Sequence, residues 1–211
     1  MQDSQKRVRW VYESTSNAEL EARYDQWADM YEQDLASKFA WNAPERTVAV
    51  FSKWVQQNAS ILDAGAGTGL VGEALIKAGY RGGSLTAIDL SRGMLAQARR
   101  KGIYRHAHQM ALGEPLDFPD DIFDAAICVG VFTQGHAPAH ALRELVRITR
   151  PGGHIVFSLK VDTYETGGFC AQQEALVAQK AWLLEESTER FQPLPKGEPE
   201  VWHQIWAYRV T

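Results

Sequence analysis

Residues 60–69 read Ser-Ile-Leu-Asp-Ala-Gly-Ala-Gly-Thr-Gly, and this stretch decides the fold. An apolar run of strand length ends at Ala64, and a glycine loop follows it at once. The apolar spacing after Gly69 predicts a helix over 70–78. Glycines let the backbone turn sharply and approach a ligand, while the first turn of a helix offers unpaired N–H groups and the positive end of its dipole. The stretch therefore predicts a strand–loop–helix unit that receives a nucleotide or a nucleotide-like group.

The spacing of the glycines separates two kinds of nucleotide ligand. Gly65 and Gly67 fit the first two places of the dinucleotide fingerprint G-x-G-x-x-G, but its third place falls at Leu70. Asp63 precedes the loop by two residues, where a carboxylate would repel a pyrophosphate. S-adenosylmethionine carries a cationic amino group and no phosphate, so an acid at this position suits that cofactor better. A nicotinamide-dependent reductase is the alternative enzyme class.

A second acid follows the next predicted strand. Asp89 directly follows the strand predicted over 84–88, one βα unit after the glycine loop. An acid at that position can accept hydrogen bonds from both hydroxyls of an adenosine ribose. It could instead cap the helix predicted over 92–101, but Ser91 already fills that place. Because NAD enzymes use the same arrangement, Asp89 predicts an adenosine ligand without choosing between cofactors.

Strands and helices alternate along the middle of the chain. Strands are predicted at 60–64, 84–88, 125–130, 154–159 and 202–209, and helices at 18–37, 44–57, 70–78, 92–101, 137–149 and 169–181. This alternation predicts βαβ units with right-handed crossovers and a mostly parallel sheet. Segments 182–191 and 201–210 alternate apolar and polar residues around a proline-containing linker, which predicts a terminal antiparallel hairpin at the sheet edge.

Composition bounds the class of protein. The 211 residues suit one domain, and 45% hydrophobic with 23% charged residues excludes a disordered chain. No apolar run reaches membrane-helix length, the N-terminal residues lack a signal-peptide core, and Cys128 and Cys170 are too few for a disulfide scaffold. We therefore expect a soluble, cytoplasmic protein.

A net charge of −4 argues against a nucleic-acid partner. We interpret the basic cluster at 6–9 as a frayed terminus.

Four motifs follow one another through the chain. They are Asp63-x-Gly65-x-Gly67-x-Gly69, Asp89-Leu90-Ser91-x-Gly93-Met94-Leu95, Phe118-Pro119-Asp120-x-x-Phe123-Asp124 and Leu145-Val146-Arg147-Ile148-Thr149-Arg150-Pro151-Gly152-Gly153. Their order and spacing resemble the successive motifs of the class I S-adenosylmethionine-dependent methyltransferases. The tract 129–136, with Tyr24, Trp27, Ala28 and Tyr31 upstream, is similar to the Williams–Beuren syndrome region methyltransferase-like subgroup.

The resemblance implies a Rossmann-like, doubly wound α/β fold with a seven-stranded, mostly parallel sheet whose last strand is antiparallel. It implies a single class I methyltransferase domain over residues 1–211, in which 1–57 form an N-terminal helical lid or cap and 58–211 form the core. The cofactor would be S-adenosylmethionine, lying over the carboxyl ends of the first strands at the topological switch point.

The resemblance also implies roles for particular residues. Asp63 would bind the methionine amino group, directly or through water, and the loop residues Ala64, Gly65 and Gly67 would pass beneath the cofactor. Asp89 would hold the ribose, Leu90 and Met94 would pack on the adenine, Met110 and Ala111 would flank its edge, and Val129 would face the methionine moiety. Many relatives have an acid after the third strand, where this chain has Ala111 or Leu112. Adenine recognition would therefore fall to backbone groups.

The N-terminal helix and one histidine complete the expected site. Tyr24 and Tyr31 share a helical face with Trp27, and we expect both tyrosines to reach the cofactor, although ordinary core packing is the alternative for Trp27. His136 is the candidate catalytic base, because an imidazole can take a proton near neutral pH. A simple capping role for the helix that starts near Ala137 is the alternative. The remaining histidines form no ligand spacing, so no metal site is expected.

These observations predict methyl transfer to an oxygen or nitrogen of a small-molecule metabolite. An acidic surface and a compact lid favour such an acceptor over a nucleic acid or a membrane, and the protein would be a monomer or homodimer. A catalytically silent S-adenosylmethionine-binding sensor or subunit is the alternative outside enzyme chemistry, because the chain shows no unmistakable base.

Overall fold

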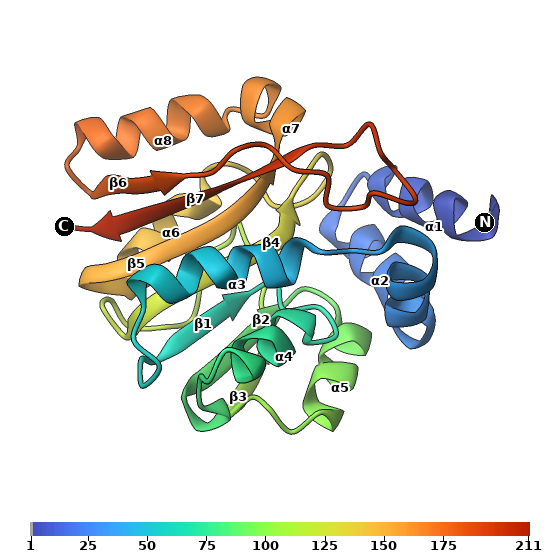
Figure 1. Cartoon of the computed structure of the whole chain (residues 1–211), viewed down its shortest axis with the longest axis horizontal. Coiled ribbons are helices and arrows are strands. Elements are labelled where there is room, and N and C mark those ends of the chain that lie inside the picture. The colour runs from blue at the N-terminus through green and yellow to red at the C-terminus, as the bar shows by residue number, and fades with distance from the viewer. Residues whose placement is uncertain (1) are drawn as a thin grey trace.

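The sheet reverses its winding next to strand β1. In the computed structural model, which describes residues 2–211, the strand order is β3-β2-β1-β4-β5-β7-β6 (Figure 1). The strands are β1 (Ile61–Ala64), β2 (Leu85–Asp89), β3 (His106–Gln109), β4 (Phe123–Phe132), β5 (Thr149–Lys160), β6 (Trp182–Ser187) and β7 (His203–Val210). Strands β1 to β5 pair in parallel, and β7 runs antiparallel to both β5 and β6. This confirms the predicted doubly wound α/β fold and its terminal antiparallel hairpin.

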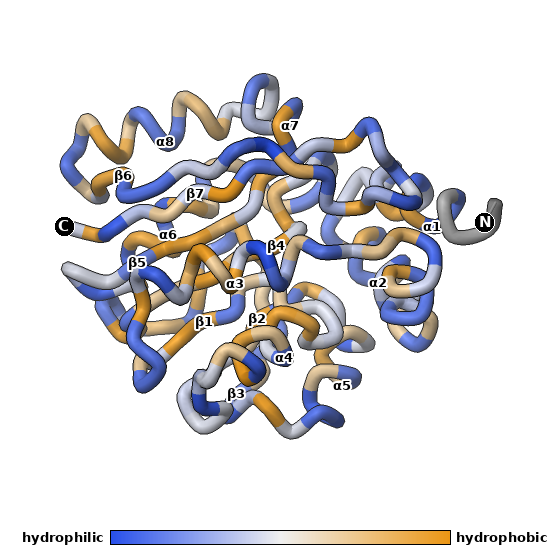
Figure 2. Tube along the Cα trace, in the orientation of Figure 1, coloured by the Kyte–Doolittle hydropathy of each residue, from blue (hydrophilic) through white to orange (hydrophobic). Residues whose placement is uncertain are grey.

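Helices cover both faces of the sheet. They are α1 (Gln2–Tyr12), α2 (Asn17–Asp34), the π-helix η1 (Leu35–Phe39), α3 (Ala43–Trp54), α4 (Leu70–Lys77), the short 3-10 helix η2 (Gly82–Ser84), α5 (Arg92–Arg100), α6 (Ala141–Ile148), α7 (Val161–Thr166) and α8 (Phe169–Ala178). One hydrophobic core joins the sheet to α3 and α4, and the other joins it to α6 and α8. Strands β1 and β2 are buried almost throughout and mostly hydrophobic (Figure 2), as expected where a parallel sheet is covered on both faces.

The N-terminal helices gather at one end of the sheet (Figure 1) and share a small core of their own. Residues 6–9, interpreted from the sequence as a frayed terminus, belong to helix α1, because Val8 and Val11 pack into this core. The buried carboxylate of Asp34 accepts a hydrogen bond from Trp27 Nε1 at 2.9 Å and forms an ion pair with Arg7 at 3.0 Å. The end of α2 is thereby tied to α1.

Helix α3 does not belong to the cap. The sequence placed the cap at 1–57, but α3 contacts β4, β5, β7 and α4, and its buried residues join the core beneath the sheet. Its apolar stripe, which includes Val48 and Phe51, therefore covers the sheet rather than the ligand. The rest of the expected cap, α1, α2 and η1, shares the separate small core, and Met1 of the expected range lies outside the described residues.

Other element boundaries differ from the predicted ones for local reasons. The helix predicted over 137–149 begins only at Ala141, after a turn through 133–140. Strand β5 begins at Thr149, in the tract expected to end that helix, and pairs there with the start of β4. Strand β3 was not predicted, because its sequence is polar and shows no apolar pattern. It lies at the edge of the sheet, where it pairs only with β2 and is largely exposed. No helix within residues 2–211 combines the length and apolarity needed to cross a bilayer.

Candidate functional site

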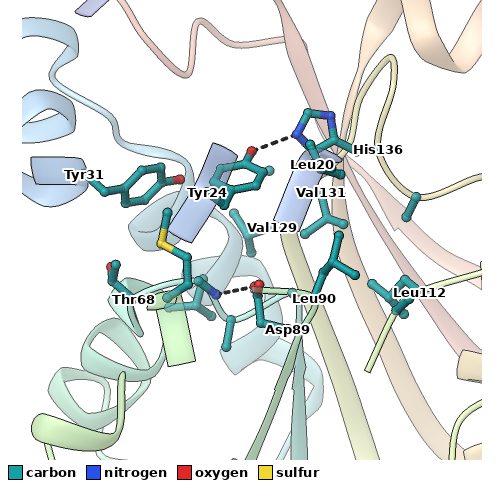
Figure 3. Close-up of a pocket in the computed structure, with 18 of the residues that line it drawn as sticks. Leu20, Tyr24, Tyr31, Thr68, Asp89, Leu90, Leu112, Val129, Val131 and His136 are labelled. Atoms are coloured by element: carbon teal, nitrogen blue, oxygen red, sulfur yellow. Dashed lines mark hydrogen bonds between the residues drawn. The ribbon is translucent and has the colours of Figure 1, made fainter. Parts of the chain in front are cut away.

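A cavity of about 850 Å³ opens above the carboxyl ends of β1, β2 and β4, at the point where the winding reverses. Helix α2 forms its roof (Figure 3). Its wall consists of Asn17, Leu20, Tyr24, Tyr31, Trp41, Gly65, Ala66, Gly67, Thr68, Leu70, Val71, Asp89, Leu90, Met94, Met110, Ala111, Leu112, Val129, Gly130, Val131, His136 and Ala137. Ligands of open α/β sheets bind in a crevice at such a switch point. Eleven of the thirteen site residues proposed from the sequence line this cavity. Tyr24, Tyr31, Gly65, Gly67, Asp89, Leu90, Met94, Met110, Ala111 and Val129 are the cofactor candidates among them. His136, the catalytic candidate, lines it as well, which leaves only two outside.

The glycine loop forms the floor of the cavity, and at two of its positions the backbone adopts a conformation that favours glycine. Gly65 and Gly67 have φ of +79° and +56°. A Cβ on Gly65 would come within 2.2 Å of Val131 Cγ2, whereas a Cβ on Gly67 would meet nothing within 4 Å. The backbone amides of Gly65 and Ala66 both donate to Ile88 O, at 2.8 and 2.9 Å, and this fixes the loop against β2. The space above Gly67 is open to a ligand.

Asp89 points into this cavity from the end of β2 (Figure 3). Its Oδ2 accepts from Gly67 N and its Oδ1 from Ser91 N, both at 2.8 Å. Burial raises the pKa of this carboxyl to about 6, although the two amide hydrogen bonds oppose that shift. The predicted cap is confirmed, because Ser91 Oγ accepts from Met94 N at 3.0 Å. Each Asp89 oxygen keeps a lone pair for a hydroxyl of the ligand.

Asp63 and Ala64, expected among the cofactor-binding residues, are the two that lie behind the wall. Both are fully buried in β1. Tyr104 donates its hydroxyl proton to Asp63 Oδ2 at 2.5 Å, and Asp63 Oδ1 has no hydrogen-bond partner among the described residues. Burial raises the pKa of the Asp63 carboxyl to about 7. The carboxyl therefore lies beneath the glycine loop with one oxygen available, and Ala64 packs in the core.

Apolar side chains close the side of the cavity next to Asp89. Leu90 and Met94 lie in its wall, followed by Met110, Ala111 and Leu112 after β3. No acid from 110–112 faces the cavity, in keeping with the departure noted in the sequence. A flat, apolar ring system fits between these side chains, with hydrogen bonds left to backbone groups.

Helix α2 is held over the cavity by its contacts with α5. Asp25 Oδ1 accepts from Ser91 Oγ at 2.5 Å and from Gly93 N at 2.7 Å. A Cβ at position 93 would lie 2.9 Å from Asp25 Cα, so a glycine lets the two helices approach. One turn further along α2, Asp29 accepts from Gln97 at 2.5 Å. These bonds place Tyr24 and Tyr31 above the cavity.

His136 lies at the wall of the cavity and contacts the hydroxyl of Tyr24. Tyr24 Oη lies 2.7 Å from His136 Nε2 (Figure 3), while Nδ1 lies 3.1 Å from both Gln134 O and Thr133 Oγ1. A carbonyl oxygen can only accept, so Nδ1 carries the proton and Nε2 accepts the proton of the Tyr24 hydroxyl. Burial lowers the pKa of His136 below its ordinary 6.5, and burial raises that of Tyr24. Both side chains are therefore neutral, and the basic Nε2 of His136 accepts the hydrogen bond of the Tyr24 hydroxyl.

Sequence reasoning missed three aromatic residues of this region. Trp41 lines the cavity, and its ring lies 3.1 Å from the Cβ that a side chain at Gly130 would carry. Tyr12 packs edge-on against His136, with ring centroids 5.3 Å apart. Tyr104 binds Asp63 from a loop before β3. None stands in a periodic pattern, and each comes from a connecting segment or a helix end. Within residues 2–211 no group of His, Cys, Asp and Glu could hold a metal ion.

The fold and cavity together define an α/β protein whose glycine loop lacks a pyrophosphate fingerprint and suits an adenosine-like ligand. The fit to S-adenosylmethionine rests on three observations. The carboxylate of Asp89 faces the cavity, Asp63 has an unpartnered buried oxygen, and the floor above Gly67 is open.

Comparison with known proteins shows which families this chain resembles. Residues 62–157 match the family model for a methyltransferase domain. The chain is 36% identical over 144 residues to methyltransferase-like protein 27 of Homo sapiens, covering 66% of this chain and 57% of that protein. It is 33% identical over 102 residues to a ubiquinone biosynthesis O-methyltransferase of Alkalilimnicola ehrlichii, covering 46% of this chain and 40% of that protein. The chain thus spans about half the length of these relatives.

Solved structures share the whole architecture. The [4+2]-cyclase SpnF superposes with a TM-score of 0.70 at 15% identity, over 93% of this chain and 97% of that one. A TehB-like S-adenosylmethionine-dependent methyltransferase from Corynebacterium glutamicum superposes with a TM-score of 0.64 at 20% identity, over 90% of this chain and 99% of that one. Residues 62–157 are thus similar to a methyltransferase domain, and the chain shares the fold of solved S-adenosylmethionine-dependent methyltransferases. The nearer Williams–Beuren subgroup stays a prediction.

Proposed function

We propose that this protein is a class I S-adenosylmethionine-dependent methyltransferase, and that it transfers the methyl group to an oxygen or nitrogen of a small-molecule metabolite. The observation that carries the proposal is the Tyr24–His136 pair, which faces the same cavity as the glycine loop and Asp89. A proton acceptor and the cofactor floor thus line the same cavity. The net charge of −4 supports an acceptor other than a nucleic acid.

The cofactor would be held by residues of the wall and of the strand beneath it. Asp89 would accept the two ribose hydroxyls, and Leu90 and Met94 would pack against the adenine ring. Met110 and Ala111 would flank the edge of that ring, and Val129 would face the methionine chain. Asp63 would bind the amino group through a water molecule, using its unpartnered oxygen. Tyr31 would close the roof.

When bound, S-adenosylmethionine would supply an electrophilic methyl group on a sulfonium sulfur, with a neutral thioether as the leaving group. Little covalent chemistry is left to the protein, whose tasks are alignment, exclusion of water and proton removal. Helix α2 excludes water by covering the cavity, and its bonds to α5 keep it in place.

The proton of the acceptor has a defined route. A hydroxyl or amine beside Tyr24 would give its proton to the phenolic oxygen, and Tyr24 would give its own proton to His136 Nε2. His136 then becomes the imidazolium, whose Nδ1 proton stays bonded to Gln134 O. His136 therefore acts through Tyr24 and not by direct contact. The two residues form one proton-accepting unit.

The names of relatives support a small acceptor. One relative is named for ubiquinone biosynthesis and for O-methyl transfer. The likeness to a [4+2]-cyclase shows that this architecture also occurs with other chemistry, so the acceptor must be tested directly.

The experiment is a turnover screen with isotopically methyl-labelled S-adenosylmethionine and a panel of uncharged hydroxyl and amine compounds. We expect label in an acceptor with wild-type protein and a much slower reaction with Tyr24→Phe. Tight binding of the cofactor with no turnover across a broad panel would favour the silent sensor instead. Binding of NADH but not of S-adenosylmethionine would favour the reductase.

A further inference from the structure

A second cavity of about 560 Å³ adjoins the cofactor cavity on the side of helix α1. We call it the side chamber. Its wall includes Val11, Tyr12, Trp27, Thr133, Leu194 and His203. Four further residues, Tyr24, Tyr31, Trp41 and Gly130, belong to the walls of both cavities. The side chamber therefore meets the cofactor cavity at the same tyrosines that roof it.

The side chamber presents an uncharged wall. Among the described residues that line it there is no Asp, Glu, Lys or Arg. Its single imidazole belongs to His203, and burial beside the cation of Lys160 lowers the pKa of this group to about 4, against the opposing charge of Asp162. The imidazole is therefore neutral at pH 7. A charged ligand would lose its hydration here without a partner, so the wall favours an uncharged one.

The wall is also rich in aromatic rings set edge to face. The rings of Trp27 and Tyr31 have centroids 4.9 Å apart at an interplanar angle of 77°, and those of Tyr24 and Tyr31 are 6.4 Å apart at 71°. The Trp27 ring is fixed by its bond to Asp34. Edge-to-face clusters of this kind accept a further planar ring with favourable quadrupole interactions. The chamber thus favours a planar ring over a flexible chain.

His203, which lines the side chamber, has one ring nitrogen without a hydrogen-bond partner among the described residues. The residue lies in β7, its side chain is 5% exposed, and the nitrogen in question is Nδ1. Its nearest ring neighbour is Phe191, with centroids 6.2 Å apart, which offers no hydrogen bond. A buried polar atom without a partner carries a desolvation cost that a ligand group can remove.

Building on the methyltransferase function proposed above, we propose that the side chamber holds the methyl acceptor, and that this acceptor is an uncharged planar ring compound with two polar groups. One is the hydroxyl that faces Tyr24 and takes the methyl group. The other lies at the far edge of the ring and forms a hydrogen bond with His203.

The test uses three naphthalene probes, titrated by calorimetry into protein saturated with S-adenosylhomocysteine. The first is a naphthalenediol with hydroxyls at opposite ends, the second a naphthol with one hydroxyl, and the third a hydroxynaphthoate with a carboxylate in place of the second hydroxyl. We expect the diol to bind about three- to tenfold more tightly than the naphthol, the effect of one neutral hydrogen bond. The hydroxynaphthoate should bind at least tenfold more weakly than the diol.

Two variants of His203 separate its hydrogen bond from its packing. His203→Leu should bind the diol and the naphthol equally. His203→Asn places an amide atom near the position of Nδ1 and should keep the preference for the diol. Val201→Trp fills the side chamber from a residue outside the cofactor cavity, and should abolish probe binding while leaving the affinity for S-adenosylhomocysteine unchanged.

The proposal is overturned if the diol competes with S-adenosylhomocysteine, if the charged probe binds as well as the diol, or if Val201→Trp binds the probes normally. It is also overturned if wild-type protein, saturated with S-adenosylhomocysteine, binds none of the three probes. If the probes bind as expected but the protein transfers no methyl group to any compound, the chamber assignment stands and the proposed function fails. The two results are therefore distinguishable.

Discussion

Replacing Tyr24 by phenylalanine removes one hydroxyl from the proposed proton route and little else. The hydroxyl donates to His136 Nε2 at 2.7 Å, and the ring packs beside Trp27 at a centroid distance of 6.3 Å. Phenylalanine keeps that ring packing, so helix α2 should stay in place. General acid–base catalysis by a positioned group contributes about 10²- to 10⁴-fold, and the lower end applies because methyl transfer needs little proton assistance. We therefore expect kcat to fall about 100-fold, with cofactor affinity changed by less than about threefold.

The assay compares single-turnover methyl transfer for Tyr24→Phe, His136→Asn and the double variant. Because the two residues act as one unit, the double variant should be no slower than the slower single variant. The wild-type rate should decline at acidic pH as His136 becomes protonated, at a pKa below the ordinary 6.5, and Tyr24→Phe should lose this decline. Nitrogen NMR should show the proton of the neutral ring on Nδ1. Multiplicative losses in the double variant, or a proton on Nε2, would refute the relay.

Three further predictions concern the cofactor floor. Asp89→Ala should weaken S-adenosylhomocysteine binding by about 1.5–3 kcal/mol, the range for hydrogen bonds to a charged group, while Asp120→Ala, which removes an exposed ion pair with Arg147 outside the cavity, should leave the affinity nearly unchanged; calorimetry on both decides, and equal losses would contradict the ribose assignment. Burial raises the pKa of Asp89 to about 6 and that of Asp63 to about 7, from an ordinary 3.8. Cofactor affinity should therefore rise about tenfold from roughly pH 5 to 7.5, because the two carboxylates ionise over this range. The stability of the ligand-free protein should fall over the same range, because the folded state binds more protons than the unfolded state. A flat affinity profile would count against ionised carboxylates in the site. Gly67 and Gly102 both have positive φ and open space at Cβ, so Gly67→Ala and Gly102→Ala should lower the free energy of unfolding by a similar amount, about 1 kcal/mol, but only the first should weaken cofactor binding.

The sequence predicted the parts of the site that depend on local pattern. The glycine loop, Asp89 and the Ser91 cap each lie at the end of an apolar strand or the start of a helix, so a few neighbouring residues define them. The mostly parallel sheet followed from the alternation of predicted strands and helices. The predicted hairpin followed from period-two patterning on β6 and β7.

The parts that the sequence did not predict depend on distant contacts. Tyr24 and His136 are 112 residues apart, and each could be assigned to the site without showing that they bond to each other. Tyr104 meets Asp63 across 41 residues from a loop, and no periodicity marks it. Helix α1 was missed because its apolar residues, Val8 and Val11, are few and stand among charges. Its packing becomes visible only with the cap assembled.

The central claim is that the cavity over the glycine loop binds an adenosyl sulfonium through Asp89. Calorimetry of the wild-type protein with S-adenosylmethionine, S-adenosylhomocysteine and NADH under identical conditions tests it most directly. We predict one molecule of either adenosyl compound bound per chain and no measurable heat from NADH. Binding of NADH together with failure of both adenosyl compounds to bind would contradict the account.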